Sequence, residues 1–456
     1  MAGIEQQAPV EQRAEAPYPS RALAWYATII LAVLAWLAIL DRFIISLLVD
    51  PIKRDLGLTD TQFGVLHGGV FALTFAVFGL LAGVLADRFN RRWTIFASVG
   101  IWSLATAACG MAQNFWQMLL ARIGVGAGEA GLNPCAVSIL SDLFPRDRLT
   151  SAMAVYSIGT SLGSGCAYLF GGIIIGVVAQ TPTLLLPIVG EIRSWQAVFF
   201  IVGIPGALFG LTIFTIPEPL RRGVAHLQRQ GSLLQNTFAG YSELLVFMRS
   251  HWKFFLYSYL GFAIASISVV GNTVWYPAHM GRTFGWSASR IGLVFGLTAM
   301  IAGLLSKLLC GVFVDLMYRR GYKDAQLRWY AGCLLVAAPL GIIGLTSASP
   351  IVFIAGIGLF TSLLASLPAV VSAGFSLVTP NELRGTSMAV FATVNAIIGS
   401  ATGPILIAAV SDHFYGGGAS IGLGMATVMG ISCPLAALIL SRAFPAMRDA
   451  VSEQER

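Results

Sequence analysis

Four charged residues stand inside long apolar stretches of the first third of the chain: Asp41, Arg42, Arg122 and Glu129. A charge at the centre of a membrane-spanning helix costs about 2.5–3.5 kcal/mol on insertion scales, so such residues usually have a function. Arg122 and Glu129 are seven residues apart, nearly two helical turns, and therefore share one helix face. An arginine that moves between two carboxylates changes which of them holds a proton. We therefore predict proton coupling by Asp41 and Glu129, with Arg122 within reach of either; the alternative is a fixed ion pair between two helices.

The composition indicates that most of the chain lies in a membrane. Of the 456 residues, 56% are apolar and 11% are charged, whereas soluble domains carry about 25% charged residues. The mean hydropathy is +0.78. The net charge of +7 comes from basic residues in short loops between apolar runs, which indicates membrane orientation and no nucleic-acid partner. The six cysteines all lie inside apolar runs and predict neither disulfides nor a metal site.

Twelve apolar runs are long enough to cross a bilayer, which needs roughly 20 residues per helix. They cover about 23–49, 62–86, 93–112, 116–140, 149–178, 195–217, 253–281, 288–316, 327–347, 351–378, 384–411 and 419–443. Most Lys and Arg residues fall on the side that holds both termini, and the opposite loops hold Lys53, Arg54, Arg193, Arg282 and Arg290. Because basic loops stay in the cytoplasm, we expect a multi-pass protein of the inner (plasma) membrane with both termini cytoplasmic.

The runs divide into two sets of six. We predict a disordered cytoplasmic tail (1–22), an N-terminal six-helix bundle (23–217), a cytoplasmic linker (218–252), a C-terminal six-helix bundle (253–444) and a second cytoplasmic tail (445–456). The apolar positions of the linker fit an amphipathic helix that lies along the inner membrane surface. The expected fold class is thus an all-α membrane protein of twelve transmembrane helices with a linker helix.

A motif recurs in both halves. Gly83, Asp87 and the Arg91–Arg92 pair after the second run match Gly311, Asp315 and the Arg319–Arg320 pair after the eighth, at an offset of 228 residues. Parallel repeats with a binding site between them are a transporter architecture. The acidic residue can accept bonds from a neighbouring helix, and Arg91 or Arg92 can pair with a carboxylate such as Asp142. We expect these residues to latch one conformation; ordinary cytoplasmic positive charge is the alternative. The expected latch consists of Gly83, Asp87, Arg88, Arg91, Arg92, Asp142, Asp315 and Arg319.

The motif Gly-x-x-x-Asp-Arg-x-x-Arg-Arg at 83–92 resembles the signature of the major facilitator superfamily, except for Asn90, where that family usually has Gly. Four further segments look like its spinster-like branch: Asp41-Arg42, the stretch 122–131, Ser141-Asp142-Leu-Phe-Pro145 and the Gly-Ser-Gly at 163–165. The resemblance is most specific over roughly 25–175. It implies a bacterial homologue of transporters for sphingosine-1-phosphate or lysophospholipids, with proton dependence in some members.

The substrate is expected to be a small amphipathic, lipid-like anion. The C-terminal half has milder midplane polar groups than the N-terminal half, and its seventh run is interrupted by Asn272 to Tyr276 before Pro277, which suggests a bend and a gate. Phe71, Phe75, Tyr156, Phe375 and Phe391 are candidates to line an apolar pocket. The expected substrate-binding residues are Arg42, Arg122, Glu129, Asn133, Tyr156, Asn272 and Tyr276.

Two alternatives remain. The first is a major facilitator for organic anions or drugs, with the same fold and proton site. The second is an integral membrane enzyme, which the sequence disfavours because His67 and His279 have no acidic residue four or five positions beyond and no metal-spaced cluster is present. We therefore expect no enzyme activity, no cofactor, and a monomer whose partners are its substrate, protons and the bilayer.

Overall fold

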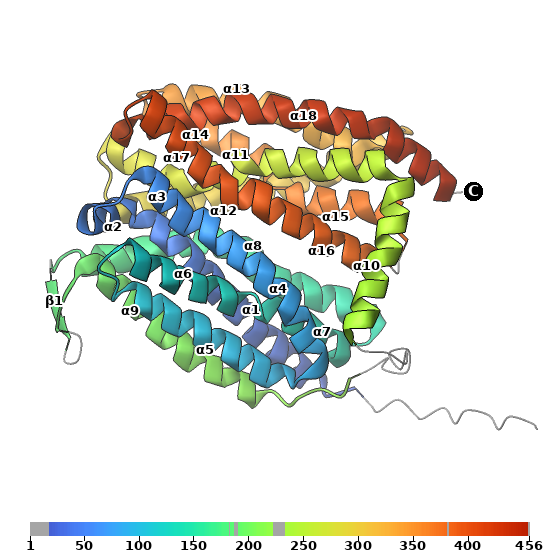
Figure 1. Cartoon of the computed structure of the whole chain (residues 1–456), viewed down its shortest axis with the longest axis horizontal. Coiled ribbons are helices and arrows are strands. Elements are labelled where there is room, and N and C mark those ends of the chain that lie inside the picture. Colours follow the sequence, from blue (N-terminus) through green and yellow to red (C-terminus); the bar gives the residue numbers. More distant parts are fainter. Residues whose placement is uncertain (1–17, 182, 187–189, 222–232, 381–382, 455–456) are drawn as a thin grey trace, which may run out of the picture.

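The chain folds into long helices arranged in two bundles that follow the two halves of the sequence (Figure 1). This computed structural model describes residues 18–181, 183–186, 190–221, 233–380 and 383–454. In the N-terminal half the helices are α1 (Arg21–Ile44), α2 (Val49–Leu56), α3 (Asp60–Gly64), α4 (Val70–Arg88), α5 (Arg91–Cys109), α6 (Phe115–Glu129), α7 (Leu132–Leu143), α8 (Arg146–Val178) and α9 (Ser194–Gly210). In the C-terminal half they are α11 (Trp252–Phe284), α12 (Ala288–Arg319), α13 (Ala325–Thr346), α14 (Pro350–Leu364), α15 (Leu367–Val378), α16 (Arg384–Val394), α17 (Thr402–Phe414) and α18 (Ile421–Gln454).

Ten helical segments of the described residues are long and apolar enough to cross a membrane. They match ten of the twelve predicted runs. The other two runs, 93–112 and 149–178, fall on α5 and α8, which are 19 and 33 residues long. A helical membrane fold is therefore confirmed, and twelve crossings remain a prediction.

Two ends of the molecule can be told apart. At one end, here called the hairpin end, lie α2 and a small antiparallel hairpin of β1 (Thr183–Leu186) and β2 (Gly190–Arg193) (Figure 1). The linker end carries the C-terminus and α10 (Leu233–Ser250), which crosses from one bundle toward the other (Figure 1). The hairpin departs from the expected all-α class. It lies in a connection between helices, where paired strands satisfy each other's backbone groups.

Several predicted runs are not uniform helices. The fourth run breaks between α6 and α7, and the tenth between α14 and α15. π-helical turns at Val65–Gly69 and Asn395–Ala401 interrupt the second and eleventh runs. Such turns concentrate at functional sites, and apolar periodicity alone does not reveal them.

One expectation about helix continuity is wrong. The seventh run is not interrupted, because α11 continues through Pro277 to Phe284. Inside a bilayer no water replaces lost backbone hydrogen bonds, so a helix continues past a proline where neighbouring helices support it. The described part of the predicted cytoplasmic tail 445–456 continues the last helix, since α18 runs through Pro445 to Gln454. Of the predicted tail 1–22, residues 1–17 lie outside the described residues.

Small residues bring the two halves together. α8 packs against α12, and α4 and α17 meet across the π-helical turns. At the α8–α12 contact a Cβ added to Gly172 would come within 2.9 Å of the Gly292 Cα atom. Only glycine allows backbones to approach this closely, as is typical of helix contacts in lipid.

Candidate functional site

The charged residues singled out in the N-terminal half gather where α1, α4 and α6 meet. Asp41, Arg122 and Glu129 are buried, with 3%, 1% and 3% of their surface exposed. Arg42 is more open, its side chain being 28% exposed. The structure thus brings together all four residues that the sequence placed at intramembrane positions.

Arg42, and not Arg122, is the partner of Glu129. Its Nη2 and Nε atoms donate to the Glu129 Oε2 atom at 2.6 and 3.2 Å. Arg122 begins about 10 Å away along the same helix, because seven residues at 1.5 Å each separate it from Glu129. In this conformation Arg122 makes no ion pair with Glu129 among the described residues, although both Glu129 and Asp41 are near enough to act on its charge. Its role in proton coupling stays a prediction.

Glu129 is the last residue of α6, before the break that precedes α7. A helix C-terminus carries a partial negative charge, so a carboxylate there needs a cation nearby. The close packing of α6 on α5 buries this position, since a Cβ on Gly128 would lie 2.5 Å from the Trp102 backbone nitrogen. Arg42 from α1 supplies the positive charge.

Several polar atoms of the charged residues at this site have no hydrogen-bond partner among the described residues. Arg122 donates from Nε to the Leu66 carbonyl at 3.4 Å, and its Nη2 atom has no hydrogen-bond partner among the described residues. One oxygen of each carboxylate, Asp41 Oδ1 and Glu129 Oε1, also lacks a partner in the part of the chain that the structure describes. Thr106, Cys109, Arg122 and Glu129 are neighbours of Asp41. Buried oxygens without donors are open to protons or substrate groups.

Aromatic rings form one wall of the site. The guanidinium carbon of Arg42 lies 4.7 Å from the centre of the Phe71 ring and 5.1 Å from that of Phe75. The guanidinium carbon of Arg122 lies 5.2 Å from the Phe71 ring centre. Such contacts stabilise a cation by about 0.5–2 kcal/mol. They hold both arginines without consuming their hydrogen-bonding capacity.

His67 is a site residue that sequence reasoning missed. It lies in the π-helical turn of the second run, 5% exposed, stacked on Phe63, with its Nδ1 atom unpartnered among the described residues. Arg122 and Arg42 are its charged neighbours. The sequence could have indicated this residue, because His67 lies within an apolar run one helical turn before Phe71.

The predicted polar residues beyond the charge cluster fall into two groups. Asn133 accepts a hydrogen bond from the Tyr156 hydroxyl at 3.1 Å, which joins α7 to α8. Asn272 and Tyr276 are 0% and 1% exposed and pack inside the C-terminal half, where the Tyr276 ring contacts Phe353. Among the described residues, the side-chain nitrogen and oxygen of Asn272 and the hydroxyl of Tyr276 have no hydrogen-bond partner. Their place in a substrate path stays a prediction.

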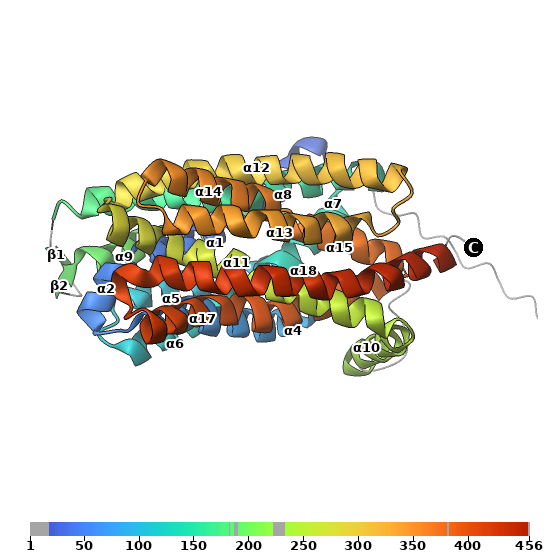
Figure 2. The same ribbon diagram turned by 90° about the horizontal axis from the view of Figure 1, so that it is seen from above.

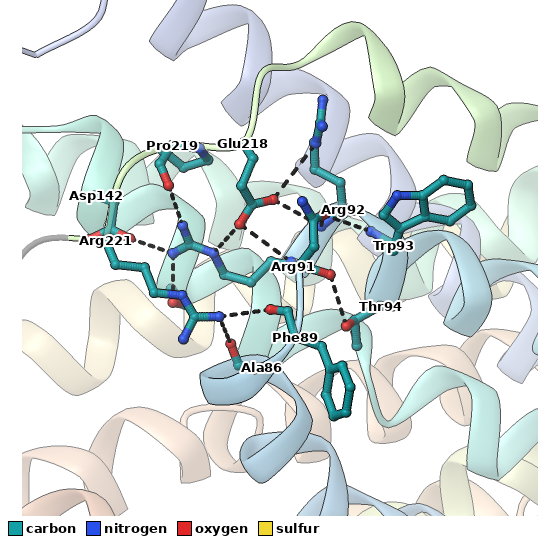
Figure 3. Close-up of polar contacts among 12 residues, drawn as sticks. Ala86, Phe89, Arg91, Arg92, Trp93, Thr94, Asp142, Glu218, Pro219 and Arg221 are labelled. Carbon is teal, nitrogen blue, oxygen red and sulfur yellow. Dashed lines mark hydrogen bonds and ion pairs between the residues drawn. The ribbon is translucent and has the colours of Figure 1, made fainter. Parts of the chain in front are cut away.

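The latch motif forms a polar cluster at the linker end (Figure 3). Arg91, fully buried, makes an ion pair with Asp142, as expected, and a second one with Glu218 through Nε at 2.8 Å. Its Nη2 atom donates to the Pro219 carbonyl at 2.7 Å. The Arg92 backbone nitrogen donates to Glu218 at 3.2 Å. The cluster therefore ties the start of the linker to α5 and α7.

Glu218 and Arg221 were not anticipated in this cluster. Arg221 Nη2 donates to the carbonyls of Ala86 and Phe89 at 2.9 and 2.7 Å, at the end of α4 (Figure 3). Both residues lie at the charged start of the linker. The sequence analysis had interpreted this segment only as a cytoplasmic connection between the bundles. The side chains of Asp87 and Arg88 lie outside the described residues.

The second copy of the motif is arranged differently. Asp315 and Arg319 are exposed at the end of α12, and no ion pair of either is present among the described residues. The two copies of the motif therefore share residue types, but among the described residues only the N-terminal copy forms a buried ion-pair network. Latching by Asp315 and Arg319 stays a prediction.

This asymmetry gives a test of the Arg91 network. Replacing Arg91 with Gln should destabilise the protein by about 3 kcal/mol, because two carboxylates lose a buried cation. Arg319→Gln, at the equivalent exposed repeat position, is the matched control and should leave the melting temperature nearly unchanged. Thermal melting of the detergent-solubilised protein measures both; equal shifts would show that the buried network contributes little.

A third cluster joins the two halves at the hairpin end. Arg282 of α11 donates to Asp50 at 2.9 Å and to both carboxylate oxygens of Asp60 at 2.8 Å. Lys53 also pairs with Asp60, whose side chain is 1% exposed. Among the described residues, the ion pairs between the halves all belong to this set. We call these four residues, Asp50, Lys53, Asp60 and Arg282, the gate cluster; the sequence had placed the two basic ones only as outer-loop charges.

Comparison with known proteins identifies the family. The family model described as Major Facilitator Superfamily matches residues 31–404. The chain belongs to the major facilitator superfamily. An MFS-type efflux pump of Mycolicibacterium smegmatis is 29% identical over 391 residues, covering 85% of each chain. Protein spinster of Drosophila melanogaster is 26% identical over 402 residues, covering 85% of this chain and 62% of the spinster chain.

Among solved structures, a bacterial homologue of the human lysosomal transporter Spinster, in an inward-facing and occupied conformation, matches with a TM-score of 0.76. It is 25% identical, over 95% of this chain and 98% of that one. The resemblance to the spinster-like branch is thereby confirmed. Transport is the activity of this family's members, and the fold and family place this major facilitator among transporters.

Proposed function

We propose that this major facilitator moves an amphipathic, lipid-like anion, of the lysophospholipid or sphingoid phosphate type, by proton-coupled alternating access. The observation that carries the proposal is the Arg42–Glu129 pair. A partly exposed guanidinium lies over the rings of Phe71 and Phe75 and is held by a buried carboxylate. The same group can exchange that carboxylate for a substrate phosphate, since arginine binds both in the same bidentate manner.

Exchange of partners couples substrate to protons. When a phosphate takes Arg42, Glu129 is left as a buried carboxylate without its cation, and binding a proton removes the cost of that charge. Asp41 and Arg122 are the other charged groups near Glu129, and His67 lies near both arginines. Arg122 makes no ion pair with either carboxylate here, but its charge acts on both Asp41 and Glu129 and can compensate either of them. The aromatic wall would hold the apolar part of the substrate.

Alternating access uses the two ends of the molecule. In this conformation the gate cluster joins the halves at the hairpin end, which the orientation of basic residues assigns to the outside of the inner membrane. The linker end is then cytoplasmic, with both termini and α10 along the inner surface. With both termini on one side, we propose an even number of crossings, twelve, and we propose that the protein is a monomer.

A second candidate is export of organic anions or drugs. The efflux pump of Mycolicibacterium smegmatis, 29% identical, favours it. The two candidates share the fold and the proton site and differ in how much apolar surface the substrate buries. A substrate with a long acyl chain gains about 0.8 kcal/mol per buried CH₂ group, whereas a compact anion gains little.

Competition in proteoliposomes separates the candidates. We expect uptake of a labelled lysophospholipid to be inhibited by other single-chain lipid phosphates, with affinity rising as the chain lengthens. Glycerol phosphate, which has the headgroup without a chain, is the control and should not compete. If hydrophilic organic anions compete equally well and chain length has no effect, the second candidate replaces the first.

A further inference from the structure

A groove of about 730 Å³ lies outside the two-bundle interface, on the C-terminal half. It is formed by the end of α12, by α13 and by α18, and α13 and α18 run side by side in both views (Figures 1 and 2). Its position near the linker end places it apart from Arg42 and Glu129. The residues that matter for its chemistry are Tyr322, Arg328, Gly332, Leu335, Leu438 and Phe444.

The walls of the groove belong to the membrane-facing surface. Leu335 and Leu438 are 55% and 58% exposed, as expected of side chains that contact lipid tails. Gly332 leaves a gap in the wall of α13, because a Cβ built on it meets no atom within 4 Å. The groove is therefore apolar, open on one side, and large enough to hold an acyl chain.

The groove is also lined by one positively charged residue, Arg328. The guanidinium carbon of Arg328 lies 5.2 Å from the ring centres of both Tyr322 and Phe444, so two aromatic rings fix its position. Arg328 pairs with the buried carboxylate of Asp324 at 2.7 Å, and Arg448 reaches the same carboxylate at 3.6 Å. Two guanidinium groups share one carboxylate, which leaves one positive charge without compensation in this cluster.

We propose that the groove binds one phospholipid with an anionic headgroup from the leaflet at the linker end. The phosphate would contact Arg328 and Arg448, and one acyl chain would lie along α13 beside Gly332. Basic pockets between helices at the cytoplasmic side are suited to anionic headgroups. Each component is on the outer surface of one bundle, so this site is separate from the proposed transport site and does not depend on the transported solute.

Filling the groove tests the proposal without touching its charges. Gly332→Leu puts a side chain into the open space, and Gly100→Leu on α5 is the matched control, because its added Cβ also meets nothing within 4 Å. The purified full-length protein is delipidated and titrated with phosphatidylglycerol, and bound lipid is counted by native mass spectrometry. We expect Gly332→Leu to weaken the first binding step at least tenfold and Gly100→Leu to leave it unchanged.

The charge is tested separately. Arg328→Gln should lose the preference for phosphatidylglycerol over phosphatidylethanolamine, and Arg328→Lys should keep most of it. Glycerol phosphate without chains should not bind detectably. Unchanged binding in Gly332→Leu, equal affinity for phosphatidylethanolamine in the native protein, or binding of glycerol phosphate as tight as that of the lipid would each overturn the proposal.

Discussion

Replacing Glu129 with glutamine should abolish the dependence of transport on a pH gradient. The amide keeps the size of the side chain and an oxygen that can accept a bond from Arg42, but it cannot bind or release a proton in the working pH range. Solute movement down its own gradient should persist at a reduced rate, because Arg42 and the aromatic wall remain. We expect the gradient-driven accumulation to fall at least tenfold.

The measurement is uptake into proteoliposomes with and without an imposed pH difference. Glu191→Gln, the same chemical change on the exposed strand β2, is the matched control and should retain full gradient dependence. Accumulation that still follows the pH gradient in Glu129→Gln would move proton coupling away from this residue. Asp41 and His67 would then be the buried titratable groups to replace next.

Replacing Arg282 with glutamine should open the hairpin end. Arg282 makes three hydrogen bonds to two carboxylates of the other half, and bonds to charged groups contribute about 1.5–3 kcal/mol each. Lys53 stays beside Asp60 and keeps part of that charge compensated. A net loss of about 2 kcal/mol shifts the equilibrium between closed and open states by roughly thirtyfold.

Spin labels at Gln113 and Phe414 report this equilibrium, since both positions are exposed near the hairpin end, one in each half. Electron paramagnetic resonance distances should lengthen in Arg282→Gln. Arg290→Gln is the matched control: this arginine lies against Trp286 at the start of α12, outside the gate cluster. Identical distance distributions in Arg282→Gln and the native protein would show that the cluster does not hold the halves together.

The sequence predicted the helical membrane fold because apolar runs of sufficient length have few other solutions. It also located the buried charges, since each stands out against its apolar surroundings. It did not identify Arg42 as the partner of Glu129, because partner choice depends on how α1 and α6 are rotated about their axes. Helical spacing on one chain segment, as for Arg122 and Glu129, says which residues share a face and not which helix supplies the counter-charge.

The gate cluster and the π-helical turns were beyond sequence reasoning for a different reason. Asp60, Lys53 and Arg282 lie at helix ends, where charges are common and most face water. Only the approach of α3 and α11 makes Asp60 a buried contact between halves. A π-helical turn adds one residue to a helical pattern, a change too small to alter an apolar run. The latch was predicted only in part. Arg91 and Asp142 pair as expected, whereas Glu218 lies at the start of the linker and was not predicted to take part.

The most direct test of proton-coupled transport is proton movement driven by the solute itself. Native protein is reconstituted into liposomes that contain a pH-sensitive dye, with no pH gradient and the membrane potential clamped. Addition of a lysophospholipid should change the internal pH, and the Glu129→Gln protein should show no such change while still moving the solute. Solute uptake by the native protein without any proton flux would contradict the account.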